Sequence, residues 1–399
     1  MKNIVFFTES IGGGVGRVIS VLSQEIQSYA RCYLVCLNQT EEVIKEVFCD
    51  VDGIHPIGKE SLSDYSLSLF QKIHRIGLHV LVAIIGHIEE IIKKKESDRL
   101  LVLKYYFKNY IIINFLDAFL NEQNIQAEFV FLNQPIFQSL LSKNKNTTLV
   151  ISERNDPNRF LNTKTTMAFV RKMYPKADAM VFQSPDAMQW YRENTNVKGK
   201  VIFNPVKPDL PERHVGERKK KIVNFCRISS QKNLALLVNA FELFSKEYTD
   251  YELYIYGDAV GNGAEGYVDS VKETISHLNC REIIHILPAQ KDIHNLIKDY
   301  AMFVSSSDFE GMSNSMLEAM AIGLPTICTD CPAGGARAII KDHENGILVP
   351  VNDAQAIADA MKEVADNPEL AEKLSINGTK IREDLSVDKI VNRWMELIE

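Results

Sequence analysis

Short apolar segments with strand character alternate with longer helical patterns along most of the chain, and the alternation restarts after residue 221. Strand candidates in the first half lie at 3–8, 31–37, 127–132, 148–152, 179–183 and 201–203. Those in the second half lie at 222–225, 253–256, 283–287, 303–305, 326–328 and 347–349. Repeated strand–helix–strand order predicts parallel sheets covered on both faces. The sequence therefore predicts an α/β chain with two Rossmann-like, doubly wound domains facing a central cleft.

A polar run separates the two halves. Residues 207–221 read KPDLPERHVGERKKK, and this charged, proline-containing composition predicts a surface linker. We expect an N-terminal domain over residues 1–204 and a C-terminal domain over 205–383. A last helical pattern, over 384–399, is expected to pack back on the N-terminal domain. Open parallel sheets bind ligands beyond the carboxyl ends of their strands, so we expect the chemistry in strand-to-helix loops.

Composition excludes several classes of protein. The 399 residues would fill two or three domains at roughly 150 residues each, and 46% hydrophobic with 24% charged residues is a globular composition. A net charge of −7 disfavours a general nucleic-acid coat. The odd, dispersed set of seven cysteines predicts reduced thiols in a cytoplasmic protein. We expect neither a signal peptide nor a membrane span, because the start soon turns polar and no apolar run reaches ~20 residues.

One segment interrupts the alternation. Residues 63–122 have helical patterns and no strand signal, and Lys93–Lys108 combines lysines with aromatic and aliphatic residues. This mixture predicts a helix lying in a membrane interface, and hence a peripheral protein on the inner face of the cytoplasmic membrane. The alternative is a core helix with solvated lysines, which Glu96 and Asp98 favour.

The first strand is followed by the glycine-rich run GGGVGR, residues 12–17. Backbone amides approach a ligand closely at glycines, and a helix N-terminus favours an anion, so Gly13, Gly14 and Arg17 are candidate ligand contacts. A dinucleotide site would have a glycine where Arg17 stands and an acidic residue after the second strand, which ends Leu37-Asn38-Gln39. The spacing therefore disfavours a dehydrogenase. A simple tight turn without a ligand is an equal alternative to a ligand-binding role for this run.

Two cations follow the first strand of the second half. Arg227 and Lys232 lie in the sequence FCRISSQKN, at the expected carboxyl edge of the sheet. Arginine as a planar fork and lysine as a point charge together suit a diphosphate. Two solvated surface charges are the alternative.

The most informative segment is residues 305–326, SSSDFEGMSNSMLEAMAIGLPT. Ser313 is expected to cap a helix that ends before Gly323. Glu318 is the only charge in that helix, and an ionised carboxylate in an apolar helix requires hydrogen bonds, for which ligand hydroxyls are suitable. With Glu310 eight residues earlier, two carboxylates and a helix N-terminus match a ribose, a diphosphate and a sugar. A packed helix with one snorkelling glutamate is the alternative.

Together these features resemble the retaining glycosyltransferases of family 4, which have the GT-B fold. The resemblance runs from about residue 3 to 396, is weakest over 40–125, and is carried by the Glu310-x7-Glu318 pattern, Arg227 with Lys232, GGGVGR and Asn204-Pro205. It implies that the C-terminal domain binds a UDP-sugar donor and that the N-terminal domain binds the acceptor. We expect that no metal or other cofactor is required, because the two cations and the helix terminus would hold the diphosphate.

The resemblance assigns roles residue by residue. Glu318 would hold the ribose hydroxyls, Glu310 the donor sugar, and Arg227 with Lys232 the diphosphate. The uracil base would lie near Pro288. The other implied donor contacts are Gly13, Gly14, Arg17, Asn204, Gly311, Met312, Ser313 and Asn314.

The chain departs from the family after the strand at 148–152. Many relatives have a histidine in that loop, whereas this chain has Arg154 and Asn155, which would orient sugar or acceptor. A departing phosphate oxygen would then accept the acceptor proton.

The motif DCPAGG, residues 330–335, resembles bacterial polysaccharide-assembly members of the family. It implies capsule, O-antigen or lipid-linked oligosaccharide pathways, and a hexosyl or N-acetylhexosaminyl transferase acting on a polyprenyl-diphosphate-linked glycan. The alternatives are a nucleotide-sugar epimerase of GT-B fold and a non-catalytic nucleotide-sugar-binding protein.

Overall fold

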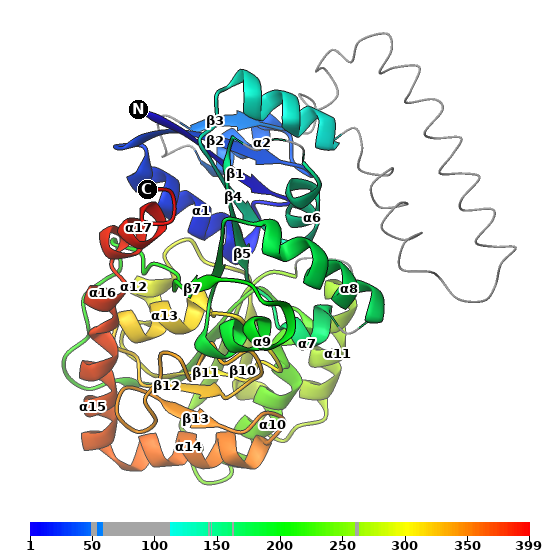
Figure 1. Ribbon diagram of the computed structural model, residues 1–399. Coiled ribbons are helices and arrows are strands. Elements are labelled where there is room, and N and C mark those ends of the chain that lie inside the picture. The colour runs from blue at the N-terminus through cyan, green and yellow to red at the C-terminus, as the bar shows by residue number, and fades with distance from the viewer. Residues whose placement is uncertain (49–53, 59–111, 143, 145, 162, 260–262) are drawn as a thin grey trace, which may run out of the picture. The chain divides into compact units, whose positions relative to one another are not determined.

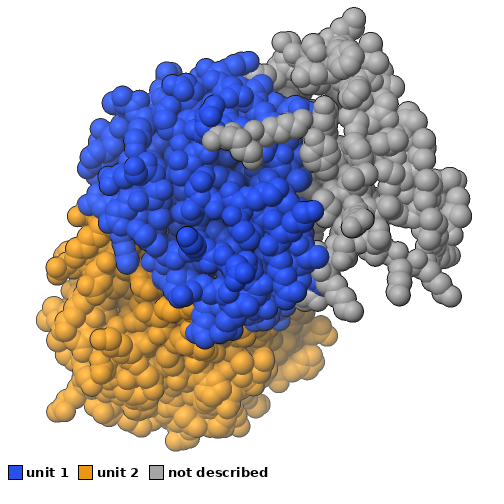
Figure 2. All heavy atoms as spheres, in the orientation of Figure 1, with its two compact units in different colours: residues 1–182, 187–202, 391–399 blue, residues 183–186, 203–390 orange. Residues whose placement is uncertain are grey.

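The computed structural model describes residues 1–48, 54–58, 112–142, 144, 146–161, 163–259 and 263–399. The chain forms two compact units (Figure 2). Unit 1 contains residues 1–182, 187–202 and 391–399, and unit 2 contains residues 183–186 and 203–390. The expected boundary at 204/205 lies two residues beyond the observed one, and the chain returns to unit 1 at residue 391 rather than 384.

Unit 1 is built on a seven-stranded parallel sheet (Figure 1). In sheet order its strands are β3 (Ile54–Ile57), β2 (Ala30–Cys36), β1 (Lys2–Thr8), β4 (Ala127–Phe131), β5 (Thr148–Glu153), β6 (Ala179–Phe182) and β7 (Gly199–Val201). All neighbouring pairs are parallel. Consecutive residues of β1 from Ile4 to Phe7 are fully buried, because helices cover both faces of such a sheet.

The helices that follow these strands are α1 (Gly13–Ile26), α2 (Glu41–Val47), α6 (Asn133–Leu141), α7 (Pro157–Phe160), α8 (Lys164–Met173) and α9 (Pro185–Thr195). The last helix of the chain, α17 (Val387–Met395), supplies a buried tryptophan to unit 1. The Trp394 ring lies 5.1 Å from the ring of Phe129 and 5.7 Å from that of Phe131. Large aromatic contacts of this kind tie the chain terminus to the sheet.

Unit 2 repeats the design with a six-stranded parallel sheet. In sheet order its strands are β10 (Ile284–Leu287), β9 (Glu252–Tyr256), β8 (Lys219–Phe225), β11 (Tyr300–Ser305), β12 (Thr326–Thr329) and β13 (Ile347–Val349). Its helices are α10 (Leu234–Ser245), α11 (Ala264–Ser276), α12 (Ile293–Ile297), α13 (Asn314–Ala321), α14 (Ala354–Asp366), α15 (Pro368–Thr379) and α16 (Ile381–Asp384). One core cluster joins apolar residues of the central strands to those of α10 and α14.

The charged end of the expected linker is in fact strand. Lys219–Lys221 begins β8, so the linker is three residues shorter than the composition indicates. The Lys221 ammonium lies 4.5 Å from the Tyr254 ring centroid, a cation–π contact that accommodates a lysine within a sheet. Arg218, just before the strand, donates to the carbonyls of Lys298 and Tyr300.

Most of the expected interfacial segment, including all of Lys93–Lys108, lies outside the described residues. Its last part, 112–122, is helical and places Phe115, Leu116, Phe119 and Leu120 in the core of unit 1. This part of the segment therefore packs as a core helix, whereas the choice between an interfacial helix and a core helix over Lys93–Lys108 stays open. Among the helices that the structure describes, none is both long enough and apolar enough to cross a bilayer.

Candidate active site

The strand order of unit 2 brings two predicted loops together. From β8 the chain moves to β9 and β10 on one side, and from β11 it moves to β12 and β13 on the other. β8 and β11 are hydrogen-bonded neighbours, so the loops at their carboxyl ends diverge from a topological switch point. Ligands of open α/β sheets bind at such points. Arg227 and Lys232 follow β8, and Glu310 follows β11.

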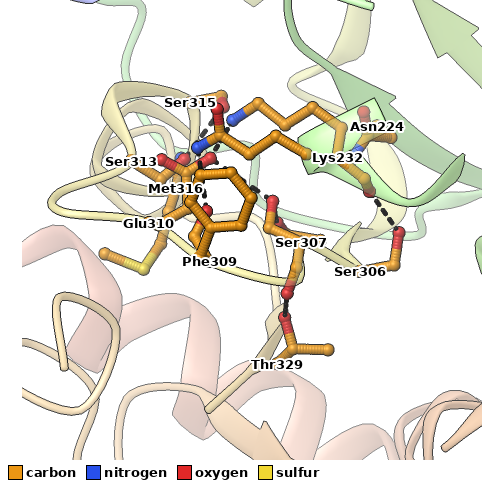
Figure 3. A network of polar contacts seen from close by, with 12 residues as sticks. Asn224, Lys232, Ser306, Ser307, Phe309, Glu310, Ser313, Ser315, Met316 and Thr329 are labelled. Carbon is orange, nitrogen blue, oxygen red and sulfur yellow. Dashed lines mark hydrogen bonds and ion pairs between the residues drawn. The ribbon is translucent and has the colours of Figure 1, made fainter. Parts of the chain in front are cut away.

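Lys232 and Glu310 form an ion pair with each other (Figure 3). Their side chains are only 13% and 14% exposed, and the Ser307 hydroxyl donates to the same Glu310 oxygen at 3.3 Å. Burial alone would lower the pKa of Lys232, but the charge of Glu310, the charge of Cys226 and the hydrogen bond to Glu310 together outweigh burial and raise it. The structure therefore keeps a permanent cation at the switch point, directly beside the carboxylate expected to hold a sugar.

A second set of bonds, between residues that the sequence analysis missed, fixes the two loops to each other. The Ser306 hydroxyl lies 3.0 Å from the carbonyl oxygens of both Lys232 and Asn233. The Asn233 amide donates to Asp308 at 2.7 Å, while the residue itself caps α10 in a left-handed conformation, φ +43°. These contacts depend on tertiary pairing, so no local pattern marks them.

Arg227 differs from its neighbours in exposure. Its side chain is exposed, and within the described part of the chain it has no hydrogen bond or ion pair. It nevertheless lies close enough to Lys232 that its positive charge opposes part of the rise in the pKa of that lysine. An exposed guanidinium beside a held ammonium is an arrangement that can receive an anion.

The helix cap expected at Ser313 is present. The Ser313 side chain accepts from the Met316 amide at 3.4 Å, and α13 ends before Gly323, which has φ +73°. Asn314, the first residue of α13, accepts from the Asn204 side chain at 2.7 Å. The structure thus joins two predicted donor contacts, Asn204 and Asn314, in one bond.

Tight packing shapes the loop before α13, which contains Gly311 and Met312. A Cβ on Gly335 would lie 1.6 Å from the Gly311 carbonyl oxygen, so only glycine fits there. The loop 330–337 that contains Gly335 is held by Arg337, which donates to Asp330 at 2.6 Å and to Asp186 at 2.9 Å. Among the described residues no group of three or more histidines, cysteines or acidic residues is placed to hold a metal ion. The absence of a metal requirement stays a prediction.

Glu318 has a protein partner that the sequence analysis did not identify. Its side chain is 4% exposed, and its Oε2 lies 2.9 Å from Nε2 of His294. The alternative of a glutamate snorkelling to solvent is therefore wrong. His294 belongs to the short helix α12 and is part of no sequence motif, so no local pattern indicates its contact with Glu318.

The predicted base position lies at the carboxyl end of β10. Pro288 is exposed there, and the next amide, Ala289, donates to Asp258 in the loop after β9 at 3.1 Å. A Cβ on Gly257 would lie 1.9 Å from the Cys226 carbonyl oxygen, so the loops after β8 and β9 also pack closely. The structure gathers the predicted unit 2 residues at one edge of its sheet.

The remaining predicted site residues belong to unit 1. Gly13 and Gly14 are exposed at the start of α1 with Arg17 one turn on, and Gly13 has φ +68°.

Arg154 follows β5 and donates to the Ser152 hydroxyl at 3.0 Å. Its guanidinium lies 4.8 Å from the Phe131 ring centroid, and burial lowers the pKa of Arg154 to about 9. Asn155, beside it, is half-buried. A contribution of these residues to donor or acceptor binding stays a prediction.

Residues 207–381 match the family model described as "Glycosyl transferases group 1". A Campylobacter jejuni protein, the N-acetylgalactosamine-N,N'-diacetylbacillosaminyl-diphospho-undecaprenol 4-alpha-N-acetylgalactosaminyltransferase, is 28% identical over 62% of this chain and 68% of its own length. An uncharacterized glycosyltransferase of Methanocaldococcus jannaschii is 24% identical over 76% of this chain and 83% of its own. Anabaena Alr3699/HepE, solved in complex with UDP and glucose, superposes with a TM-score of 0.75 at 13% identity, over 99% of both chains. Unit 2 therefore carries a glycosyltransferase group 1 domain, and the chain is a glycosyltransferase enzyme with the two-domain GT-B fold.

Proposed function

We propose that this glycosyltransferase is a retaining enzyme of family 4 that transfers a sugar from a UDP-sugar to a lipid-linked glycan. The observation that carries the proposal is the buried Lys232–Glu310 pair with the exposed Arg227 beside it, at the switch point of unit 2. One place in the molecule thus offers cations for a diphosphate and a carboxylate for sugar hydroxyls.

The donor assignment follows from charge and hydrogen-bonding capacity. A diphosphate carries acceptor oxygens only, which suit Arg227 and Lys232, whereas sugar and ribose hydroxyls suit the acceptors Glu310 and Glu318. The Anabaena protein of the same fold was solved with UDP and glucose, which supports a uridine nucleotide as the donor. We infer a hexosyl or N-acetylhexosaminyl donor that needs no metal, since the cations already oppose the diphosphate charge.

In the proposed reaction the bond between the anomeric carbon and the phosphate oxygen breaks, and its electron pair stays on UDP. Arg227 and Lys232 stabilise that growing negative charge, an electrostatic effect typically worth several kcal/mol when the groups are preorganised. An acceptor oxygen forms the new bond on the same face of the sugar. Its proton passes to the departing phosphate oxygen, so the atoms balance without a protein base.

The acceptor assignment is supported by the Campylobacter jejuni relative, whose name specifies a diphospho-undecaprenol acceptor. The resemblance of the loop at 330–335 to polysaccharide-assembly enzymes points the same way. We therefore place the enzyme in bacterial surface-glycan assembly, such as capsule or O-antigen synthesis, with unit 1 binding the acceptor. Attachment to the inner membrane face through Lys93–Lys108 belongs to the same proposal.

The test is a transfer assay with radiolabelled UDP-glucose, UDP-N-acetylglucosamine and UDP-N-acetylgalactosamine and a synthetic polyprenyl-diphosphate glycan. We expect label in the lipid fraction, stoichiometric UDP, and retained anomeric configuration by NMR. Isomerised sugar without an acceptor would favour the epimerase alternative. Tight binding of UDP-sugars without turnover on any lipid-linked acceptor would favour a non-catalytic binding protein.

A further inference from the structure

The pair formed by Glu318 and His294 lies within unit 2 and has no counterpart in the predictions made from the sequence. Glu318 is the only charged residue of α13, and both of its sequence neighbours, Leu317 and Ala319, are buried. A buried carboxylate needs hydrogen-bond donors to remain ionised. His294 supplies one, with Nε2 at 2.9 Å from Oε2 of the glutamate.

The imidazole is itself held in place. Its side chain is 12% exposed, and its ring meets the Phe225 ring edge-on, with centroids 5.8 Å apart and planes at 90°. The flanking residues Ile293 and Ile297 of α12 are buried and anchor the helix that carries it. A ring fixed on two sides can fix the orientation of the carboxylate that it contacts.

We infer that His294 is a positioning residue, which orients the Glu318 carboxylate to accept the two vicinal hydroxyls of the donor ribose. This inference rests on the proposed function, because it assumes a nucleoside diphosphate in the site. A carboxylate has about four lone-pair positions, and the histidine contact takes one of them while restricting rotation about the terminal torsion. A carboxylate that is oriented in advance loses less conformational entropy when the ribose hydroxyls bind.

His294 also follows the predicted base position by a few residues, since α12 begins soon after Pro288. The same short stretch would thus contact the base and orient the group that reads the ribose. The alternative hypothesis is that His294 occupies the place of a ribose hydroxyl and must be displaced when UDP binds. The two hypotheses predict opposite changes in UDP affinity when the imidazole is removed.

The experiment measures dissociation constants by calorimetry for UDP and for 2′-deoxy-UDP, with the full-length protein. The variants are His294→Ala, His294→Gln, Glu318→Gln and the double variant of His294→Ala with Glu318→Gln. The control is His343→Asn, which breaks an exposed histidine–glutamate contact of 3.1 Å at a left-handed residue that asparagine tolerates. Thermal melting temperatures of every variant report on folding.

We expect the wild-type protein to prefer UDP over 2′-deoxy-UDP. The His294→Ala change should weaken UDP binding roughly tenfold and 2′-deoxy-UDP binding much less. The ratio of the two dissociation constants should therefore move toward one. The His294→Gln variant, which retains a donor, should recover part of the preference, and His343→Asn should leave it unchanged. The double variant should bind UDP only slightly more weakly than Glu318→Gln alone.

Four outcomes would overturn the inference. Equal weakening of both nucleotides, or a lower melting temperature with an unchanged ratio, would make His294 merely structural. Tighter UDP binding by His294→Ala would establish the displacement hypothesis. If the wild-type protein binds none of UDP, GDP, ADP and dTDP, the proposed function fails and the inference fails with it.

Discussion

At the scale of single residues, the site combines two cations with different exposure. Lys232 is held by Glu310 and by the loop bonds around it, whereas Arg227 is exposed next to it. An ammonium kept in place by a carboxylate costs little reorganisation when an anion arrives, and an exposed guanidinium is able to form a bidentate contact. On the proposed function, the two side chains would contact the same diphosphate in different ways.

The Arg227→Ala change should lower kcat/KM for sugar transfer at least ~100-fold, because it removes a positive charge that stabilises the leaving diphosphate. Initial rates with a UDP-sugar and a lipid-linked acceptor measure the loss. Arg281→Ala, which removes an exposed arginine of the same unit, is the control and should retain full activity. Turnover near the wild-type level in Arg227→Ala would rule out its diphosphate role.

A buried carboxylate in unit 1 should make stability depend on pH. Glu128 in β4 accepts from the Ser139 hydroxyl at 2.6 Å, and burial raises its pKa from 4.5 to about 7. The folded chain thus binds this proton more tightly than the unfolded chain, so this group's contribution to stability falls as the pH rises from 4.5 to 7.

The Glu128→Gln variant should lack this component. Its free energy of unfolding relative to wild type should rise by up to about 3 kcal/mol between pH 4.5 and pH 7.5, the equivalent of the pKa difference. Urea denaturation at a series of pH values gives the comparison. A difference that does not change with pH would show that Glu128 titrates normally in the folded state.

At the scale of elements, the site depends on loops packed so tightly that side chains are excluded. The Gly335→Ala change would place a Cβ 1.6 Å from the Gly311 carbonyl and push the loop that carries Glu310. We expect a loss of stability of about 1–3 kcal/mol or more, together with weaker UDP binding. Gly266→Ala in α11, where a Cβ meets nothing within 4 Å, should keep binding and slightly raise stability.

Melting curves and UDP titrations of both glycine variants measure these effects. If Gly335→Ala matched wild type in both, the packing of the loop at 330–337 against Gly311 would have no role in shaping the site.

The sequence predicts most elements of this fold because buried parallel strands are continuous apolar runs and their helices are amphipathic. It misses β3, since Pro56 argues against a strand, although proline is tolerated at the sheet edge where β3 lies. It also places β7 two residues late, because that edge strand is only partly buried and has no strong apolar pattern.

The site shows the same division. Charge and spacing mark Glu310, Lys232 and Glu318 as candidates, because the first two are charged groups in predicted strand-to-helix loops and Glu318 is the only charge in an apolar helix. His294 and Asn233 could not be identified in this way, because their importance comes from partners 24 and 75 residues away in the chain. A single sequence contains no local signal for such pairs.

At the scale of the whole molecule, both units use the same strand order, with the fourth strand returning beside the first. In unit 1 this places the switch point between β1 and β4, and in unit 2 between β8 and β11. The glycine-rich start of α1 and the Arg227–Lys232 loop are therefore topological equivalents, each following the first strand of its unit.

The proposed membrane attachment would also act at the level of the whole molecule. Changing Lys93, Lys94 and Lys95 together to glutamate should reduce sedimentation with anionic liposomes, because each lysine contributes about 1 kcal/mol near such a surface. Transfer to a short soluble acceptor should be unaffected. Unchanged sedimentation would refute the interfacial helix, whereas loss of soluble transfer would indicate a role in folding or acceptor binding.

A crystal structure of the protein with bound UDP would locate the donor site. We expect diphosphate oxygens within hydrogen-bond distance of Arg227 and Lys232 and the ribose hydroxyls on the Glu318 carboxylate, beyond the carboxyl ends of β8 and β11. UDP bound elsewhere on the molecule, or bound there with Glu318 out of reach of the ribose, would contradict this expectation.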